Sequence, residues 1–239
     1  GKNWLSCTIP LKERIAYKIK NEVGIDPIVH MTCRDRNINA TKALLLGLNI
    51  ENILNVILIT GDPIPTAERD EVKSVFQFNS TKLANFVVDM NRNIFTNKIN
   101  IGGALNINAR NFDIELQRAK KKEEAGVNVF YTQPVISHIA VENIKKARAK
   151  LKGFIMGGLM PVVSHRNAVF MDAEISGINV EQNVIDRYEG VDKETADKLA
   201  VEIATYFGEK IKDYIDGYYI ITPFNRVDLV TKVIENIEQ

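Results

Sequence analysis

Short, almost wholly apolar runs alternate along the chain with longer segments in which apolar residues recur every three or four positions. The runs start near residues 27, 52, 99, 127, 152 and 217 and are too short for buried helices. Because they are apolar throughout and do not alternate with polar residues, we expect strands of a parallel sheet that helices cover on both faces. The segments between the runs predict those helices, at 11–23, 38–48, 80–95, 111–125, 138–151, 196–211 and 226–238.

One complete strand–helix–strand unit is contained in Ile99–Gln133. Its first apolar run includes Gly102 and is followed by a helix for which either Asn111 or Asp113 can serve as the N-cap. Lysines occupy the last turn of this helix, where the helix dipole favours cations, and Gly126 ends it. A second buried strand follows directly.

Six strands of this kind leave two architectures open. The first is an open, doubly wound sheet. The second is a (β/α)8 barrel of the TIM type, of which this chain shows about six of the eight strands and lacks the first βα unit and the second strand. No linker or change of composition divides the chain, so we expect one domain over residues 1–239. The long segment 160–189 is predicted to be irregular, with short helical pieces.

The composition excludes several classes of protein. Lysine and arginine number 31 against 30 aspartates and glutamates, which gives no reason to expect nucleic acid or an anionic membrane as a partner. The two cysteines, Cys7 and Cys33, form neither a disulfide framework nor a metal site. The longest apolar runs, about nine residues, are too short to span a membrane. With no signal peptide visible, we expect a cytoplasmic protein.

Nucleotide-binding and hydrolase motifs with fixed spacing do not occur, and the candidate chemistry lies in polar residues where successive strands end. The carboxyl ends of parallel strands meet at one rim, where α/β enzymes bind their ligands. Each residue alone has a structural explanation: His30 as a hydrogen-bonded core histidine, Asp62 as the organiser of a turn. The prediction rests on the set, which comprises His30, Thr32, Asp62, Asn106, Asn108, Gln133, His165, Thr222, Asn225 and Arg226.

Several of these residues lie in segments that resemble the methylenetetrahydrofolate reductase family. The segments are HMTCRDRN at 30–37, ITGDP at 59–63, Ala125-Gly126 with YTQP at 131–134, and ITPFNR at 221–226. The resemblance covers essentially the whole chain and is strongest to the bacterial type that is sometimes fused to a homocysteine methyltransferase. This family is a (β/α)8 barrel with FAD at its carboxyl rim, so the resemblance favours the barrel. About 50 residues are then expected to precede Gly1, because one and a half βα units are missing.

The resemblance also implies roles for individual residues. Asp62 is the expected catalytic residue, close to both the flavin and the folate. Thr60 stands where the family often has arginine, and Leu105-Asn106 replaces a Tyr-Pro pair, so those flavin contacts are expected to differ. FAD is expected to contact His30, Thr32, Thr60, Gly61, Asp62, Ala104, Asn106, Asn108, Glu115 and Lys122. The folate is expected to contact Gln133, His165, Phe224 and Arg226.

The activity implied by the resemblance is oxidoreductase chemistry in one-carbon metabolism and methionine biosynthesis. A reduced nicotinamide, NAD(P)H, would reduce FAD, and the reduced flavin would then convert 5,10-methylenetetrahydrofolate to 5-methyltetrahydrofolate in a ping-pong reaction. The family's general acid is a glutamate on a strand that this sequence does not contain. An alternative is therefore a flavin- and folate-binding subunit of a larger one-carbon complex that is non-catalytic or depends on a partner. The partners considered are a second copy in a homo-oligomer and an electron-donating subunit. A third and weaker alternative is a phosphate-binding barrel lyase or aldolase. Its aldolase form is disfavoured, because no lysine lies in mid-strand to form a Schiff base.

Overall fold

The computed structural model describes residues 9–61 and 73–238, with the side chains of 9–13 excepted. Two compact units are present. The first comprises Gly1–Gly103 with Lys121–Val129, and the second comprises Ala104–Lys120 with Phe130–Gln239. The expectation of a single domain stays a prediction.

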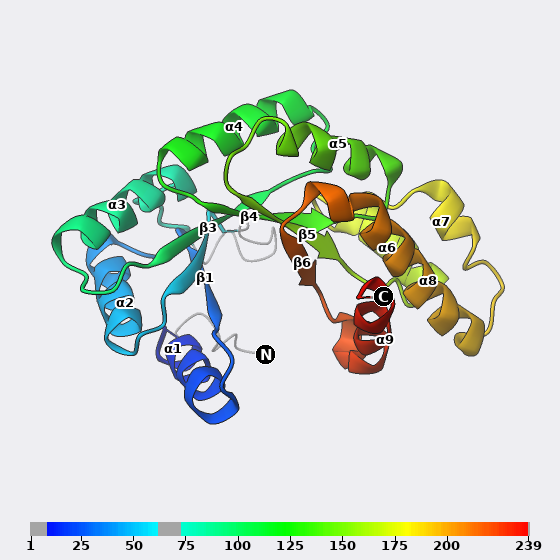
Figure 1. The fold of residues 1–239 in the computed structure, drawn as a ribbon, viewed down its shortest axis with the longest axis horizontal. Coiled ribbons are helices and arrows are strands. Elements are labelled where there is room, and N and C mark those ends of the chain that lie inside the picture. Colours follow the sequence, from blue (N-terminus) through cyan, green and yellow to red (C-terminus); the bar gives the residue numbers. More distant parts are fainter. Residues whose placement is uncertain (1–8, 62–72, 239) are drawn as a thin grey trace. The chain divides into compact units, whose positions relative to one another are not determined.

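The six predicted strands are all present and form one sheet (Figure 1). Neighbouring strands follow each other in chain order, β1-β2-β3-β4-β5-β6. A doubly wound sheet reverses its strand order at a switch point, whereas a TIM-type barrel keeps the chain order, so the α/β barrel class is confirmed. The strands are β1 (Ile28–Thr32), β2 (Asn55–Ile59), β3 (Asn100–Leu105), β4 (Val129–Pro134), β5 (Phe154–Leu159) and β6 (Gly217–Ile220).

Helices follow the strands in the alternation that the periodicity predicts. Among the described residues they are α1 (Ile9–Lys18), α2 (Ile38–Ile50), α3 (Ser80–Asn93), α4 (Phe112–Glu124), α5 (His138–Arg148), α6 (His165–Glu174), α7 (Gln182–Asp186), α8 (Lys193–Ile211) and α9 (Val227–Ile237). Helices α6 and α7, of 10 and 5 residues, are the short helical pieces predicted within the irregular segment 160–189.

The predicted first helix ends at Gly24 as expected, with Gly24 in a left-handed conformation, and its last turn, Ile19–Val23, is π-helical. One boundary differs from the predictions for a local reason. The second strand starts at Asn55 and not at Asn52, because Asn52 has a positive φ of 55° and turns the chain out of α2.

In the first unit, β2 pairs in parallel with β1 and with β3, and helices cover it. Helix α2 is capped by Asn37, whose side chain accepts a hydrogen bond from the backbone of Ala40, and it buries Leu44, Leu45 and Leu48. Helix α3 packs against β2. Its apolar side includes Leu83, Val87 and Met90, all buried.

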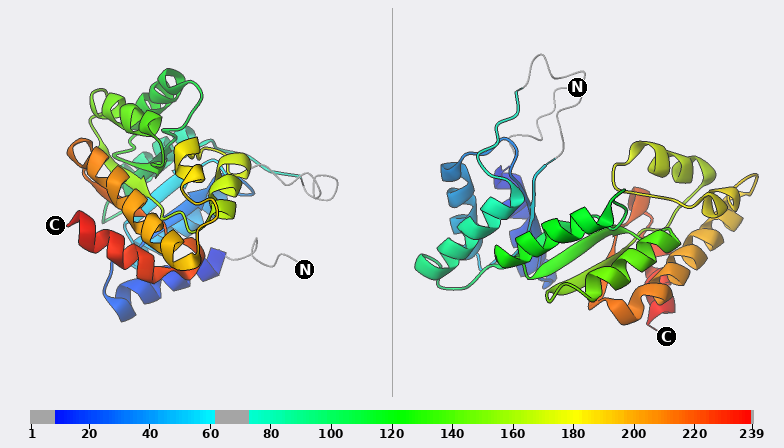
Figure 2. Two further views of the ribbon diagram at one scale, coloured as in Figure 1. Left: turned by 90° about the vertical axis from the view of Figure 1, so that its right-hand side faces the viewer. Right: turned by 90° about the horizontal axis from the view of Figure 1, so that it is seen from above.

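In the second unit, β5 pairs in parallel with β6, and the long helix α8 packs against β5. Helices α8 and α9 lie side by side (Figure 2). Gly208 of α8 allows this approach, because an added Cβ there would lie 3.2 Å from both Ile237 of α9 and Leu159 of β5. The close helix packing brings the first turns of α8 and α9 near each other at the carboxyl end of β6.

Two features are absent from residues 9–61 and 73–238. No helix in these ranges has the length and apolar character needed to cross a membrane. The same ranges contain no group of three or more histidine, cysteine, aspartate or glutamate side chains that could hold a metal ion.

Candidate functional site

In the first unit, the predicted flavin contacts lie at the ends of β1 and β2. His30 and Thr32 are two positions apart on β1 and therefore point to the same face of the sheet, with His30 exposed and Thr32 half-buried. Beyond the strands, the backbone N–H of Arg34 donates to the carbonyl of Thr60 at 3.1 Å, so the pairing of β1 with β2 continues into the rim.

Glycine is required next to this pairing. Gly61 has a φ of +99°, and an added Cβ would lie 2.9 Å from Cβ of Arg34. Both observations explain why position 61 is a glycine. Asp62, the predicted catalytic residue, lies outside the described residues. Lys122, in the last turn of α4, is half-buried.

In the second unit, the structure brings three predicted flavin contacts together behind β3. The backbone N–H of Asn108 donates to Oδ1 of Asn106 at 3.0 Å, and the backbone N–H of Asn106 donates to Oε1 of Glu115 at 3.3 Å. Glu115 is buried, with Arg118 at 3.7 Å as its ion-pair partner. Asn111, one of the two predicted caps, accepts from the backbone of Ile114 and thereby starts α4. Side-chain acceptors thus fix the 106–108 turn before α4 begins.

Asn108 also connects this turn to two other segments. Its side-chain amide donates to the carbonyl of Gly177 at 2.9 Å and to that of Pro134 at 3.3 Å. The 160–189 segment and the end of β4 are therefore tied to the turn after β3. Oδ1 of Asn108 is buried and has no hydrogen-bond partner among the described residues. A buried acceptor of this kind calls for a donor from a ligand or from water.

A further asparagine holds the same turn from α5. Asn143 is buried, and its amide donates to the carbonyl of Ile107 at 2.8 Å. Sequence reasoning placed residue 143 within a helix but assigned it no role, because a contact with a turn 36 residues earlier has no local signal.

At the end of β4, a threonine orders the strand next to the predicted folate contact Gln133. The hydroxyl of Thr132 donates to the carbonyl of Gln133 at 2.9 Å and accepts the backbone N–H of Gly158 at 2.7 Å. On the face of β4 opposite to Thr132, the ring of Tyr131 packs edge to face against the ring of Tyr219 of β6, with ring centroids 5.5 Å apart. Burial raises the pKa of both phenols, which therefore stay protonated at neutral pH. This pair was not predicted from the sequence.

The remaining predicted folate contacts lie after β5 and β6. His165 is exposed at the start of α6, after the N-cap Ser164. Phe224 lies in the turn after β6 and is 73% exposed. Gln133, His165, Phe224 and Arg226 make no hydrogen bond with one another in the described part of the chain.

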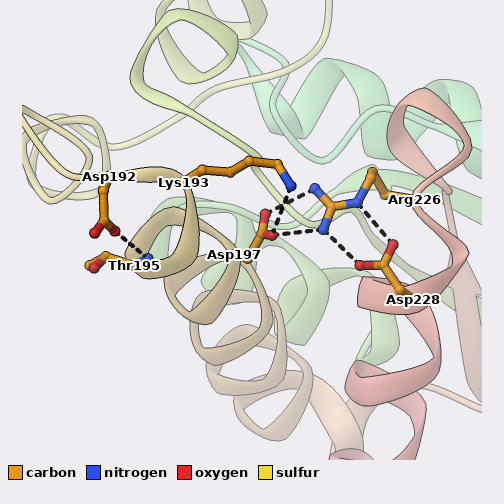
Figure 3. A network of polar contacts seen from close by, with 6 residues as sticks. All are labelled: Asp192, Lys193, Thr195, Asp197, Arg226 and Asp228. Carbon is orange, nitrogen blue, oxygen red and sulfur yellow. Dashed lines mark hydrogen bonds and ion pairs between the residues drawn. The ribbon is translucent and has the colours of Figure 1, made fainter.

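Arg226 is engaged by two carboxylates (Figure 3). Nη1 and Nη2 donate to Asp197 of α8 at 2.9 and 2.8 Å, and Nε and Nη2 donate to Asp228 of α9 at 2.9 and 2.7 Å. The guanidinium lowers the pKa of Asp197 and lowers that of Asp228 to about 2, and hydrogen bonds to the two carboxylates raise the pKa of Arg226 itself. Neither aspartate was predicted to belong to the site. An arginine two residues before an aspartate is a weak local signal for one of them.

The residues of the second unit suit the hydroxyl-rich part of a flavin cofactor. The buried, unpaired Oδ1 of Asn108 can accept from a ribityl or ribose hydroxyl. The turn that carries it is fixed by Glu115 and Asn143, so it is organised without a ligand. In the first unit, Lys122 supplies a cation suited to phosphate oxygens.

Parallel strands in chain order, alternating with helices, define an α/β protein of the TIM-barrel type. The family model for methylenetetrahydrofolate reductase matches residues 6–238. The chain therefore belongs to the methylenetetrahydrofolate reductase family, which indicates a folate-related, reductase-type role. The sequence resemblance to this family is confirmed.

One solved structure shares the fold, and two others match at lower TM-scores. A protein from Clostridium thermocellum, described as uncharacterized and as binding two copies of 5-methyl-5,6,7,8-tetrahydrofolic acid, is 14% identical with a TM-score of 0.58, over 92% of this chain and 76% of its own. A dihydrodipicolinate synthase is 13% identical with a TM-score of 0.39, over 90% and 76% of the two chains. The tryptophan synthase alpha chain from Legionella pneumophila is 11% identical with a TM-score of 0.37, over 95% and 97%. No match was found among curated protein sequences.

Proposed function

We propose that this protein is an FAD-dependent reductase that converts 5,10-methylenetetrahydrofolate to 5-methyltetrahydrofolate, with NAD(P)H as the electron donor. The observation that carries the proposal is membership of the methylenetetrahydrofolate reductase family over residues 6–238. The fold shared with a protein that binds 5-methyltetrahydrofolate supports a folate as the substrate. Location in the cytoplasm stays a prediction from the sequence.

The described residues would divide the work between cofactor and substrate. Asn106, Asn108 and Glu115 would hold the hydroxyl-rich part of FAD, and Lys122 would face its phosphates. Bound FAD supplies the hydride-transfer chemistry. Gln133 would hydrogen-bond the folate ring, since its amide can both donate and accept, while His165 and Phe224 would pack against aromatic parts of the substrate. Asp62 remains the proposed catalytic carboxylate from the family resemblance.

The test begins with flavin binding by the purified chain. We expect a flavin absorption band either as purified or after titration with FAD. Replacement of Asn108 by Leu removes the buried acceptor for the cofactor together with the amide that donates to Gly177 and Pro134. It should weaken FAD binding about 5- to 30-fold, equivalent to about 1–2 kcal/mol. Asn236→Leu, at an exposed asparagine on α9, is the matched control and should bind FAD as the wild type does.

Turnover then separates the two functional hypotheses. Bleaching of bound FAD by NADH or NADPH, followed by its return on addition of 5,10-methylenetetrahydrofolate, would support the reductase. A chain that binds both ligands without this cycle would instead support the partner-dependent subunit. Failure to bind FAD at any concentration would refute the proposal for this chain.

A further inference from the structure

The turn after β6 holds two consecutive residues in a backbone conformation that side chains disfavour. Phe224 has a φ of 46° and Asn225 a φ of 60°, and neither is glycine. Asparagine tolerates the left-handed region, whereas a bulky aromatic residue rarely adopts it. Strain of this kind persists only where the surroundings fix the backbone, and it is concentrated at functional positions.

Both ends of the turn are fixed. At its start, Pro223 is buried and its carbonyl accepts the backbone N–H of Arg226 at 2.8 Å. At its end, Arg226 makes paired hydrogen bonds to Asp197 and to Asp228, which come from different helices. Between these two fixed points the ring of Phe224 is left 73% exposed. We call Arg226, Asp197 and Asp228 the carboxylate clamp.

The clamp leaves the arginine little capacity to bind a ligand. A guanidinium has five N–H groups, and four of those on Arg226 donate to the two aspartates. At most one is left, so a paired grip on a substrate carboxylate would have to displace one aspartate. Charge-assisted bonds of 2.7 to 2.9 Å are the strong class of hydrogen bond, which opposes such a displacement.

We infer that the carboxylate clamp is a positioning device: Asp197 and Asp228 act through Arg226 to hold the strained turn, and so fix the ring of Phe224 where it packs against the flat aromatic part of the substrate. This inference rests on the proposed function, because it requires a folate as the ligand of Phe224. It assigns Arg226 a role different from the direct folate contact that the family resemblance implies.

The test compares Asp197→Asn, Asp228→Asn and the double variant with a matched control. Glu202→Gln is that control, because Glu202 also lies on α8 and pairs with an arginine, Arg187, at 2.8 Å, away from the turn. For the clamp variants we expect the KM for the folate to rise about tenfold, the scale of one lost aromatic contact, while kcat and FAD affinity stay unchanged. The control should match the wild type.

Two comparisons distinguish positioning from direct binding. If Arg226 bound the substrate carboxylate itself, Asp228→Asn would free the guanidinium, and folate affinity would stay the same or increase. That result would overturn the inference. A tetrahydropteroate substrate that lacks the glutamyl tail provides the second comparison. Positioning predicts the same loss in the clamp variants with and without the tail, and a loss confined to the tailed substrate would contradict it.

A reporter that needs no folate separates this inference from the proposed function. With Trp4 replaced by Phe, a Phe224→Trp variant carries its only tryptophan in the turn. We expect the fluorescence anisotropy of this tryptophan to fall when Asp228→Asn is added, because the turn is released. Unchanged anisotropy would overturn the inference whatever the enzyme does. The opposite case is a fall in anisotropy with Asp228→Asn but an unchanged folate affinity in Phe224→Ala. The clamp would then hold the turn as inferred, while the proposed contact of Phe224 with the folate would be wrong.

Discussion

Replacement of Asn143 by leucine tests whether the turn after β3 is held from α5. Asn143 is 5% exposed and its amide donates to the carbonyl of Ile107 at 2.8 Å. Ile107 is fully buried in the 106–108 turn, so water cannot replace the lost donor. Leucine has the same number and branching of side-chain heavy atoms as asparagine, although its methyl groups are larger than the amide atoms. The substitution therefore removes the hydrogen bond without leaving a large cavity.

The cost follows from the buried carbonyl. A buried acceptor without a partner costs about 1–3 kcal/mol, and the greater apolar character of leucine offsets part of this cost. We expect a net loss of about 1–2 kcal/mol in the free energy of unfolding. For a chain of this size that corresponds to a fall in Tm of about 2–8 °C. FAD affinity should fall as well, because Asn108 is carried by the same turn.

Thermal unfolding followed by circular dichroism measures the effect. Asn236→Leu on the surface of α9 is the control and should change the free energy of unfolding by less than about 0.5 kcal/mol. If Asn143→Leu melted within about 1 °C of the wild type, the carbonyl of Ile107 would have another donor and the reasoning would fail. A lower Tm with unchanged FAD affinity would show that the turn is stabilised by α5 but does not hold the cofactor.

Two further predictions concern the second unit. Gly158→Ala should lower the free energy of unfolding by about 1–3 kcal/mol, and with it the urea midpoint, because the new Cβ would lie 2.7 Å from the backbone oxygen of Thr132. An unchanged midpoint would contradict the close approach of β5 to β4. Acid should weaken the carboxylate clamp. The pKa of Asp228 in the folded protein is about 2, below its value in the unfolded chain. The ion pair of Asp228 therefore stabilises the fold above about pH 4, and this contribution is lost as the pH falls toward 2. The urea midpoints of the wild type and of Asp228→Asn should therefore approach each other over this range. Arg226, the partner of Asp228, also faces Asp197 in both proteins. A constant difference between the two midpoints would argue against the ion pair.

The fold was predictable because its elements have local signals. A parallel strand that helices cover on both sides must be apolar throughout, and each of the six such runs forms a strand. The cap at Asn111 and the stop at Gly126 depend on the conformations of single residues, and both lie where the sequence places them. The choice between sheet and barrel was open from pattern alone, because local periodicity does not reveal the order of strands.

The candidate site was only partly predictable. Asn106, Asn108 and Glu115 were selected from their place after a strand and from the family resemblance, and they do lie together. The contact of Asn108 with Gly177 spans 69 residues, and that of Arg226 with Asp197 spans 29. Such contacts depend on how loops pack in three dimensions, and no spacing rule encodes them.

The two fixed turns of the second unit differ in the kind of bond that holds them. The 106–108 turn is held mainly by asparagine amides that donate to backbone carbonyls. These hydrogen bonds join uncharged groups and are therefore insensitive to salt. The turn at 223–226 depends on ion pairs between Arg226 and two partly exposed aspartates, which salt screens and acid neutralises. High salt or low pH should therefore loosen the ring of Phe224 before it loosens Asn108. Folate binding would then be more sensitive to ionic conditions than FAD binding, because each ligand depends on a different one of these turns.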